Sequence, residues 1–273
     1  MTKRYCVDSA RKLKLRHFDP GDTGEFADDD EGRAECEAQT TDLLTRLDDF
    51  QGRLYASRRH SLLIILQGMD TAGKDGTIRK VMGGFNPIGC VVESFKVPTE
   101  WELAHDYLWR VHRVAPPKGY VGIFNRSHYE DVLVTRVHGM VSKKICKRRY
   151  QEIRNFEKHL AENGTVILKF FLHIGKEEQR ERLQERIDTP DKRWKFNLGD
   201  LKERKLWDEY QEAYEDAIGA TGTKAAPWYV VPADKKWYRN WVVSRVLCKT
   251  LDAMNLKYPQ PPKEVNFRKI RVK

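Results

Sequence analysis

Residues 68–74, GMDTAGK, have the glycine and lysine spacing of a loop that binds phosphate groups. Gly68 and Gly73 would let the backbone wrap around an anion with its amide groups pointing inward, while Lys74 adds a positive charge. An apolar stretch precedes the loop and a helical pattern starts near Gly76, as this mechanism requires. We therefore predict a nucleotide-phosphate site at Gly68, Gly73, Gly76 and Lys74. A glycine-rich turn without a ligand is the alternative.

An aspartate, Asp75, follows the lysine where such loops carry a serine or threonine that helps to hold magnesium. The metal would then need another ligand, and Asp70 inside the loop is the first candidate. A carboxylate among phosphate-binding amides is repelled by phosphate unless a cation lies between them. We predict that Asp70 binds Mg²⁺, with Mn²⁺ as the alternative ion. In the other interpretation, Asp70 only stabilises the turn by accepting hydrogen bonds from backbone amides.

A second group of polar residues, FNRSHYEDV at 124–132, begins near the end of a predicted strand. Arg126 can reach phosphate with its fork of donors, Asn125 offers an uncharged oxygen to a metal, and Glu130 adds an acidic group. We interpret His128 as a packing residue in preference to a general base. Ligands of parallel sheets bind at the carboxyl ends of the strands, so this group is predicted to lie beside the glycine-rich loop.

A third segment, 186–210, gathers cations around a proline and a glycine. Its basic residues include Arg186, Lys192, Arg193, Lys195 and Arg204. Pro190 and Gly199 would act as hinges, and the segment lies between the fourth and fifth predicted strands. We predict a lid at about 184–206 that closes over phosphates, with an ordinary solvated helix surface as the alternative.

Apolar runs and helical periodicities alternate along the chain. The runs predict strands at 61–67, 90–97, 120–127, 165–174 and 228–232. The periodicities predict helices at 34–57, 76–84, 98–114, 143–161, 176–188, 200–218 and 234–255. The Gly- and Asp-rich stretch at 18–32 is predicted to be an exposed loop or arm. Strands that alternate with helices form parallel sheets, so we predict an α/β fold with about five strands and helices on both faces.

The chain of 273 residues carries a net charge of +10 that is unevenly distributed. Residues 1–50 hold 8 basic and 13 acidic side chains, whereas residues 142–205 hold 18 basic and 11 acidic ones. The basic segment favours a polyanionic partner: a nucleotide, polyphosphate, nucleic acid or anionic lipid. The sequence contains no long apolar run, no secretory signal and only 5 scattered cysteines, which predicts a cytoplasmic protein with reduced thiols.

Four motifs follow one another in the order seen in the polyphosphate kinase 2 family, which the chain resembles over roughly residues 35–258. They are GMDTAGKDG, HDYLWR, FNRSHYEDV and KRWKFNLGD. The opening FDPGDTG is similar to the arms of the family's third class. The resemblance implies a P-loop nucleotide-kinase-like fold with a helical lid. It also implies magnesium-dependent, reversible phosphoryl transfer between inorganic polyphosphate and nucleotides.

The resemblance also implies roles for individual residues. Lys74 and Arg126 match phosphate-binding positions and, together with the magnesium ligand Asp70, are predicted to be catalytic. Asn125 stands where many members have an aspartate that helps to hold the metal. An asparagine at this position with Glu130 nearby is similar to the third class of the family. Members of that class phosphorylate nucleoside mono- and diphosphates, which here implies AMP to ADP and ADP to ATP. The residues predicted to bind polyphosphate are Lys74, Arg79, Lys80, Arg186, Lys192, Arg193 and Lys195.

We divide the chain into an N-terminal arm at 1–34, a kinase domain with its lid at 35–258 and a basic C-terminal tail at 259–273. The resemblance suggests a homo-oligomer, either a dimer or a tetramer, and no nucleic-acid or membrane partner is predicted. An ATP-dependent nucleotide kinase is the main alternative, although Asp75 and the many lid cations favour a longer anion. A nucleic-acid-binding protein and an inactive scaffold are weaker alternatives, because RNA-binding strand motifs are absent and the loop lysine is intact.

Overall fold

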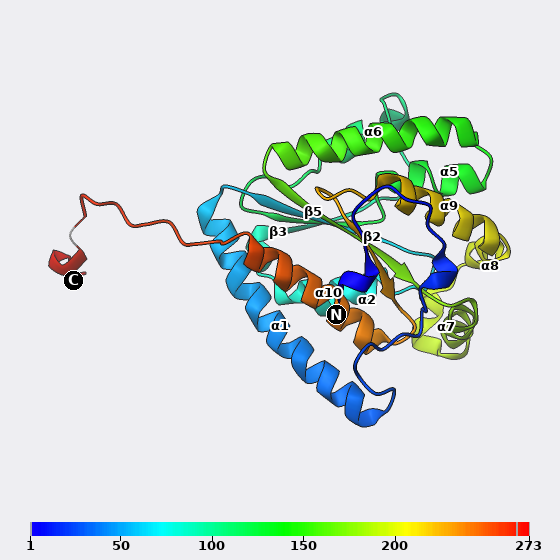
Figure 1. Cartoon of the computed structure of the whole chain (residues 1–273), viewed down its shortest axis with the longest axis horizontal. Helices are drawn as coiled ribbons and strands as arrows, with labels where there is room; N and C mark the ends of the chain where they lie inside the picture. Colours follow the sequence, from blue (N-terminus) through cyan, green and yellow to red (C-terminus); the bar gives the residue numbers. More distant parts are fainter. Residues whose placement is uncertain (1, 266, 273) are drawn as a thin grey trace.

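A six-stranded sheet forms the centre of the computed structural model, which describes residues 2–265 and 267–272 (Figure 1). The strands are β1 (Cys6–Val7), β2 (Ser61–Gln67), β3 (Cys90–Ser94), β4 (Val121–Asn125), β5 (Thr165–His173) and β6 (Trp228–Pro232). Across the sheet the order is β1-β6-β5-β2-β4-β3. The pair β1 and β6 is antiparallel, and the other four pairs are parallel. The predicted α/β fold with a mostly parallel sheet is confirmed.

Helices cover both faces of the sheet. Figure 1 shows α1, α2 and α10 on one face and α5, α6 and α9 on the other. The helices are α1 (Asp30–Ser57), α2 (Lys74–Val81), α3 (Glu100–Leu103), α4 (Trp109–His112), α5 (Val134–Val137), α6 (Lys143–Glu162), α7 (Lys176–Asp188), α8 (Leu198–Lys205), α9 (Trp207–Thr221) and α10 (Lys236–Ala253). Short 3₁₀ turns include η5 (His128–Asp131) and η6 (Pro190–Lys195). In the part of the chain that the structure describes, none of these helices could cross a membrane.

The central strand β2 is apolar because both of its faces are covered. All 7 of its residues are buried, and it pairs with β4 on one side and β5 on the other. Leu66 lies opposite Asn125 in β4, and Gln67 lies opposite Phe171 in β5. The carboxyl ends of these three strands therefore meet at one edge, and the loop after β2 begins beside the residues that follow β4.

The five predicted strands are all present, and β1 is a sixth strand that we did not predict. It has 2 residues and pairs Cys6 with Tyr229 and Val7 with Trp228 at the edge of the sheet. A strand of this length is too short to show an alternating pattern of apolar and polar residues. The predicted helix at 200–218 is also divided, because α8 ends at Lys205 and α9 begins at Trp207.

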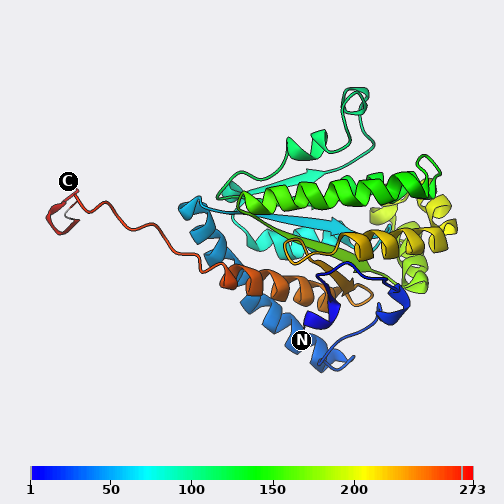
Figure 2. The ribbon, with the colours of Figure 1, turned by 45° about the horizontal axis from the view of Figure 1, so that its top comes forward.

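The single helix predicted over 98–114 was wrong. The capping box of Thr99 and Glu102 is present, but it opens only the short α3, and α4 follows after a break. Trp101, an aromatic residue that a single amphipathic helix would turn toward the core, is 66% exposed. Figure 2 shows this segment projecting from the body of the molecule after β3. Because α3 contains no buried residue, the helical periodicity at the start of the segment is not reinforced by a core.

The stretch predicted to be an exposed loop contains a buried anchor, Phe26. Its side chain is 4% exposed and packs edge-on against Trp237, Tyr238 and Trp241 of α10. A single phenylalanine among Gly and Asp residues creates no periodic pattern, so the sequence did not reveal this contact. The N-terminal segment thus contributes at least one large side chain to the core.

Replacing Phe26 with alanine is expected to lower the free energy of unfolding by about 3–5 kcal/mol, because the ring contacts are lost and a cavity remains. Urea denaturation followed by tryptophan fluorescence measures the change. Phe267→Ala is the matched control, since Phe267 is 57% exposed. The control is expected to change stability by less than about 0.5 kcal/mol. Equally small effects of both substitutions would contradict a role of Phe26 in the core.

Candidate active site

The loop at residues 68–73 joins β2 to α2 with the geometry that its glycines predict. Gly73 precedes α2 with φ of 100°, in the left-handed region that favours glycine. A Cβ atom on Gly73 would lie 1.9 Å from Nη1 of the buried Arg239, so a side chain there would displace this guanidinium group. Gly76 lies in the first turn of α2. The loop and the start of α2 thus have the form that presents backbone amides to an anion.

Lys74 is the first residue of α2, and its side chain turns back into the loop. Its Nζ donates hydrogen bonds to the carbonyl oxygens of Gly68 at 2.5 Å and Met69 at 3.2 Å. Burial, together with the nearby charge of Arg126, lowers the pKa of Lys74 from 10.5 to about 8. Phosphate oxygens next to this ammonium group would favour its charged form.

Arg126 follows β4 in a strained backbone conformation. Its φ of 64° lies in the left-handed region, which is costly for a residue other than glycine. Its amide donates to the carbonyl of Leu66 at 3.0 Å. Its guanidinium contacts Oδ1 of Asp70 at 3.1 Å and Oε2 of Glu130 at 3.6 Å. The structure therefore brings the predicted residues Asp70, Arg126 and Glu130 into direct contact.

The two unusual residues of the site, Asn125 and Asp75, contact each other. Nδ2 of Asn125 donates a hydrogen bond to Oδ1 of Asp75 at 2.7 Å. The amide nitrogen is thus engaged, and the side-chain oxygen of Asn125 is the atom that remains for a cation. Asp75 therefore orients Asn125 at the same edge of the sheet as Asp70.

The oxygen atoms at this edge fit Mg²⁺, which prefers carboxylate and amide oxygens and keeps water and phosphate among its ligands. Asp70 offers a carboxylate and Asn125 an amide oxygen. Among the described residues, no group of three or more His, Cys, Asp or Glu side chains could enclose a metal ion. A magnesium ion at this edge would thus depend on bound phosphate and water for most of its ligands.

A cavity of about 360 Å³ opens between the loop, the turn after β4, and helices α8 and α9. The charged residues that line it are Asp70, Arg126, Glu130, Asp200 and Glu203. Burial raises the pKa of Glu130 and also that of Asp200. Because carboxyl groups outnumber the guanidinium, a polyanion would be repelled from this cavity until further cations enter it.

The cations predicted for the lid lie in α7 and η6, and they are not among the described residues that line this cavity. Arg186 pairs with Asp200 at 3.1 Å and so comes nearest to it. Lys192, Arg193 and Lys195 each contact a neighbour in α7 or η6. The structure thus places the segment beside the cavity but leaves these four side chains paired with their own surroundings.

Three residues that the sequence analysis missed hold the loop from behind. Gln179, Arg182 and Arg239 donate hydrogen bonds to the carbonyl oxygens of residues 70–72, at 3.1, 3.0 and 3.4 Å respectively. All three side chains are buried. They belong to α7 and α10, which carry many exposed charges, and nothing in the sequence separates them from those charges.

A smaller cavity of about 190 Å³ adjoins the first and shares Arg126 and Glu130 with it. Its walls are largely apolar and include Phe95, Val111 and Met140. A concave apolar surface with a few polar groups at one end is the usual form of a site for a small organic ring. Two adjoining cavities, one polar and one apolar, match the two halves of a nucleotide.

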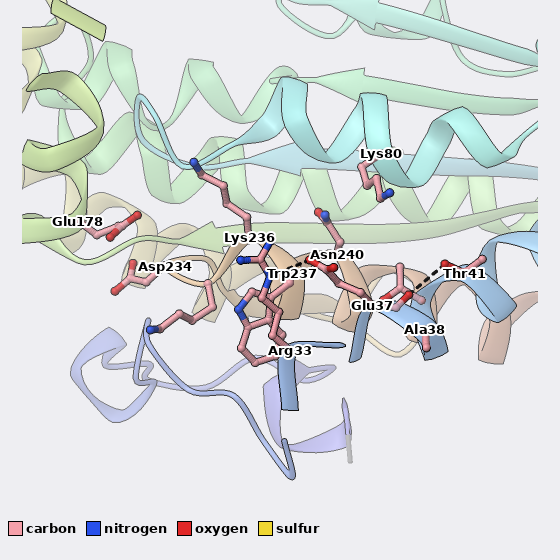
Figure 3. A pocket seen from close by; sticks show the side chains of 12 residues that line it. Arg33, Glu37, Ala38, Thr41, Lys80, Glu178, Asp234, Lys236, Trp237 and Asn240 are labelled. Atoms are coloured by element: carbon pink, nitrogen blue, oxygen red, sulfur yellow. Dashed lines mark hydrogen bonds and ion pairs between the residues drawn. The ribbon is translucent and has the colours of Figure 1, made fainter. Parts of the chain in front are cut away.

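A groove of about 710 Å³ lies on the other side of the loop, between α1, α2, α7 and α10. Figure 3 shows Lys80 of α2 and Lys236 of α10 at this groove, with Lys236 extending toward the loop. Within the described chain, neither lysine forms an ion pair, whereas Arg33 at the groove pairs with Glu37 at 3.0 Å. Of the two cations predicted on α2, Lys80 lines the groove, and Arg79 is exposed beside it.

The buried ammonium of Lys74 predicts a dependence of stability on pH. Its folded-state pKa of about 8 lies below the unfolded value of about 10.4, so the unfolded chain binds more protons between these limits. The fold is therefore expected to gain stability as pH rises through this window. Relative to Lys74→Met, the free energy of unfolding of the wild type should rise by about 2 kcal/mol between about pH 7.5 and 9.5. Urea denaturation at both pH values checks this; a constant difference would show that Lys74 titrates normally.

Comparisons with known proteins agree with this geometry. Residues 30–259 match the family model of polyphosphate kinase 2 (PPK2). The chain is 56% identical over 260 residues to an AMP/ADP-polyphosphate phosphotransferase of Meiothermus ruber, a match that covers 95% of this chain and 96% of the relative. It is 44% identical over 271 residues to an ADP-polyphosphate phosphotransferase of Rhodopseudomonas palustris, covering 95% and 92%.

A solved structure has the same fold along most of its length. The crystal structure of polyphosphate kinase 2 from Arthrobacter aurescens matches with a TM-score of 0.90 and 41% sequence identity, covering 95% of this chain and 92% of that one. The phosphate-type loop, the strand-end arginine and the parallel sheet thus occur in a chain whose sequence and fold both match one family. This chain belongs to the polyphosphate kinase 2 family.

Proposed function

We propose that this chain is a phosphotransferase of the third class, which moves the terminal phosphoryl group of inorganic polyphosphate to AMP and to ADP in a reversible reaction. One observation carries the proposal. Lys74, Asp70 and Arg126 meet at one edge of the sheet, between a groove for a long anion and a pair of cavities for a nucleotide. The relative from Meiothermus ruber is named for the same three substrates.

The nucleotide occupies the two adjoining cavities. Its phosphates lie in the polar cavity beside Arg126, and its base and sugar lie against the apolar walls near Phe95 and Val111. The shared residues Arg126 and Glu130 then stand at the junction between nucleoside and phosphate. This arrangement is supported by the order of the cavities, since the polar one contacts the glycine-rich loop.

Polyphosphate approaches the loop from the groove on the opposite side. Its reacting end lies near Lys74 and Arg126, and the units behind it follow Lys80 and Lys236. The two unpaired ammonium groups support this path, because a linear polyanion needs cations along its length and not only at its end. An ATP molecule has three phosphates and would leave most of such a groove unused.

Phosphoryl transfer to a nucleotide needs little help from a general base, because the acceptor oxygen is already anionic. The obstacle is the repulsion between two polyanions and the charge on the group in transfer. Lys74 and the loop amides neutralise phosphate oxygens on one side, and the guanidinium of Arg126 binds them on the other. A single such donor contributes on the order of 10²–10³ to the rate.

Magnesium, or manganese in its place, would be held by Asp70 and Asn125 together with phosphate and water oxygens. The ion would supply positive charge that offsets the repulsion between the two phosphate substrates. This requirement is supported by the excess of carboxyl groups in the polar cavity, where Asp70, Glu130 and Asp200 would otherwise repel phosphate.

The segment at about 184–206 acts as the lid. Its closure brings Arg186, Lys192, Arg193 and Lys195 toward the phosphates and excludes water from them. The pair of Arg186 with Asp200 supports this role, because Asp200 already lines the polar cavity. When phosphate enters, it can replace the carboxylate as the partner of the arginine.

We also propose a cytoplasmic protein that forms a homo-oligomer, a dimer or a tetramer, and that binds neither nucleic acid nor membranes. The cysteines support the location, since all 5 are free thiols. Exposed apolar side chains support self-association: Ile88, Val97, Trp101 and Leu103 are each at least 66% exposed. In this proposal residues 1–34 form the arm, 35–258 the kinase domain and 259–273 the tail.

Incubation of the purified protein with Mg²⁺, polyphosphate and AMP tests the proposal. We expect ADP and then ATP by chromatography, without any added nucleoside triphosphate. Lys74→Met is expected to lower the rate by at least about 10²-fold, because the buried charge next to the phosphates is lost. Phosphorylation of AMP that requires a nucleoside triphosphate would instead identify an ATP-dependent nucleotide kinase. No transfer from either donor would contradict the enzymatic assignment.

The path of polyphosphate predicts the effect of the two groove lysines. In Lys80→Gln/Lys236→Gln, each lost charge is expected to raise the KM for long-chain polyphosphate about fivefold. The KM for AMP and for tripolyphosphate should change little, since a short chain reaches only the loop. The matched control is Lys144→Gln/Lys147→Gln, which removes two exposed charges from α6 on the other face of the sheet. Equal KM changes for short and long chains would place the polyphosphate path elsewhere.

A further inference from the structure

We infer that Tyr129, held by the buried pair of Lys169 and Glu157, is a positioning residue that keeps Arg126 and Glu130 directed at the loop. This inference rests on the proposed function and goes beyond it, since these three residues lie beneath the site and line neither its cavities nor the groove. Each of the three residues is at most 1% exposed.

The pair itself joins a central strand to a helix. Nζ of Lys169 in β5 lies 2.6 Å from Oε2 of Glu157 in α6, and both side chains are almost completely buried. Lys169 also donates to Oη of Tyr129 at 2.9 Å and to the carbonyl of Thr221 at 2.9 Å. All three N–H groups of the ammonium therefore have acceptors, which a buried charge requires.

Tyr129 binds to both members of the pair. Its hydroxyl accepts the hydrogen bond from Lys169 and donates to Oε1 of Glu157 at 2.8 Å. Its ring is fully buried and meets the indole ring of Trp228 edge-on, with ring centres 4.7 Å apart. A tyrosine fixed at its hydroxyl and along its ring has no alternative position, so the backbone that carries it is fixed as well.

That backbone belongs to the turn η5, which contains Glu130 and lies just after Arg126. Ser127 caps the turn: its Oγ accepts from the amide of Tyr129 at 3.2 Å and from Nε2 of Gln67 at 3.2 Å. Tyr129 lies three residues after Arg126 and directly before Glu130. The left-handed backbone of Arg126 costs free energy and persists only where its surroundings determine it. The contacts of Tyr129 hold this backbone conformation of Arg126 in place from its C-terminal side.

His128 does not hold the turn in place, although it lies between Arg126 and Tyr129 in the sequence. Its side chain is 1% exposed, and its Nε2 is 3.5 Å from Oε1 of Glu157, too far for a good hydrogen bond. Its Nδ1 has no hydrogen-bond partner within the described structure. Burial lowers the pKa of His128, so its ring is neutral and adds no charge to the network. The directional contacts of the turn therefore come from Tyr129.

Tyr129→Phe tests the inference, because it keeps the ring and removes only the hydroxyl. We expect kcat for AMP phosphorylation to fall about tenfold, with the KM values for AMP and polyphosphate within about twofold, since misplacement of Arg126 affects mainly the transition state. Tyr150→Phe is the matched control: Tyr150 is also buried and its hydroxyl accepts from Arg136. Near-ultraviolet circular dichroism verifies that both variants are folded. An unchanged kcat in folded Tyr129→Phe would overturn the inference.

A double-mutant cycle with Arg126→Lys separates positioning from a general loss of stability. If Tyr129 acts through Arg126, Tyr129→Phe should lower kcat by less than about twofold in the Arg126→Lys background. Independent, multiplicative effects on kcat would contradict this route. If Tyr129→Phe does not fold, the apolar replacement Lys169→Met/Glu157→Leu removes the anchor and is expected to lower kcat in the same way. A wild-type protein without polyphosphate-dependent activity would refute the proposed function, not the positioning role.

Discussion

The contact between Asp70 and Arg126 is the interaction on which the site depends. It closes the gap between the loop after β2 and the turn after β4 with an ion pair at 3.1 Å. Lys74, buried next to it, has a pKa of about 8, because burial and the charge of Arg126 both oppose its protonation. Without a bound anion, the charges of Lys74 and Arg126 are thus balanced mainly by nearby carboxylates. In the proposed function, an entering phosphate would replace Asp70 at Arg126, and the released carboxylate would be free to bind magnesium.

In the proposed function, the two substrates lie on different sides of the loop, and the charges on these two sides differ. On the side of α1 and α10, the groove is lined by four basic and three acidic side chains, and Lys80 and Lys236 have no ion-pair partner among the described residues. A polyanion therefore meets a small excess of positive charge there. On the side of α8 and α9, carboxyl groups outnumber the single guanidinium of Arg126. In the proposed function, a nucleotide would enter there only with its metal ion or after the lid cations arrive. In this arrangement, polyphosphate and the nucleotide would be distinguished by charge as well as by shape.

The sequence predicted what depends on local pattern and missed what depends on contacts between distant segments. The apolar run of β2 and the polar residues after β4 were sufficient to place Asp70 beside Arg126, because parallel strands end at one edge. The anchor Phe26 and the buried Arg239 were not predicted, since burial of an isolated residue leaves no periodic signal. The helix expected at 98–114 failed for the converse reason: its pattern is helical, but no core element packs on Trp101.

The buried donors behind the loop follow from the geometry of the peptide group. In a planar trans peptide the N–H and C=O bonds point in opposite directions, so amides that face an anion require carbonyls that face away from it. Gln179, Arg182 and Arg239 bind the carbonyls of residues 70–72, whose partner amides are those of residues 71–73. The amide of residue 72 closes a turn on the carbonyl of residue 69 at 3.2 Å, which leaves two amides for phosphate. The buried Arg182 and Arg239 do not line the cavity, yet they hold the peptide planes of the loop in the orientation that an anion site requires.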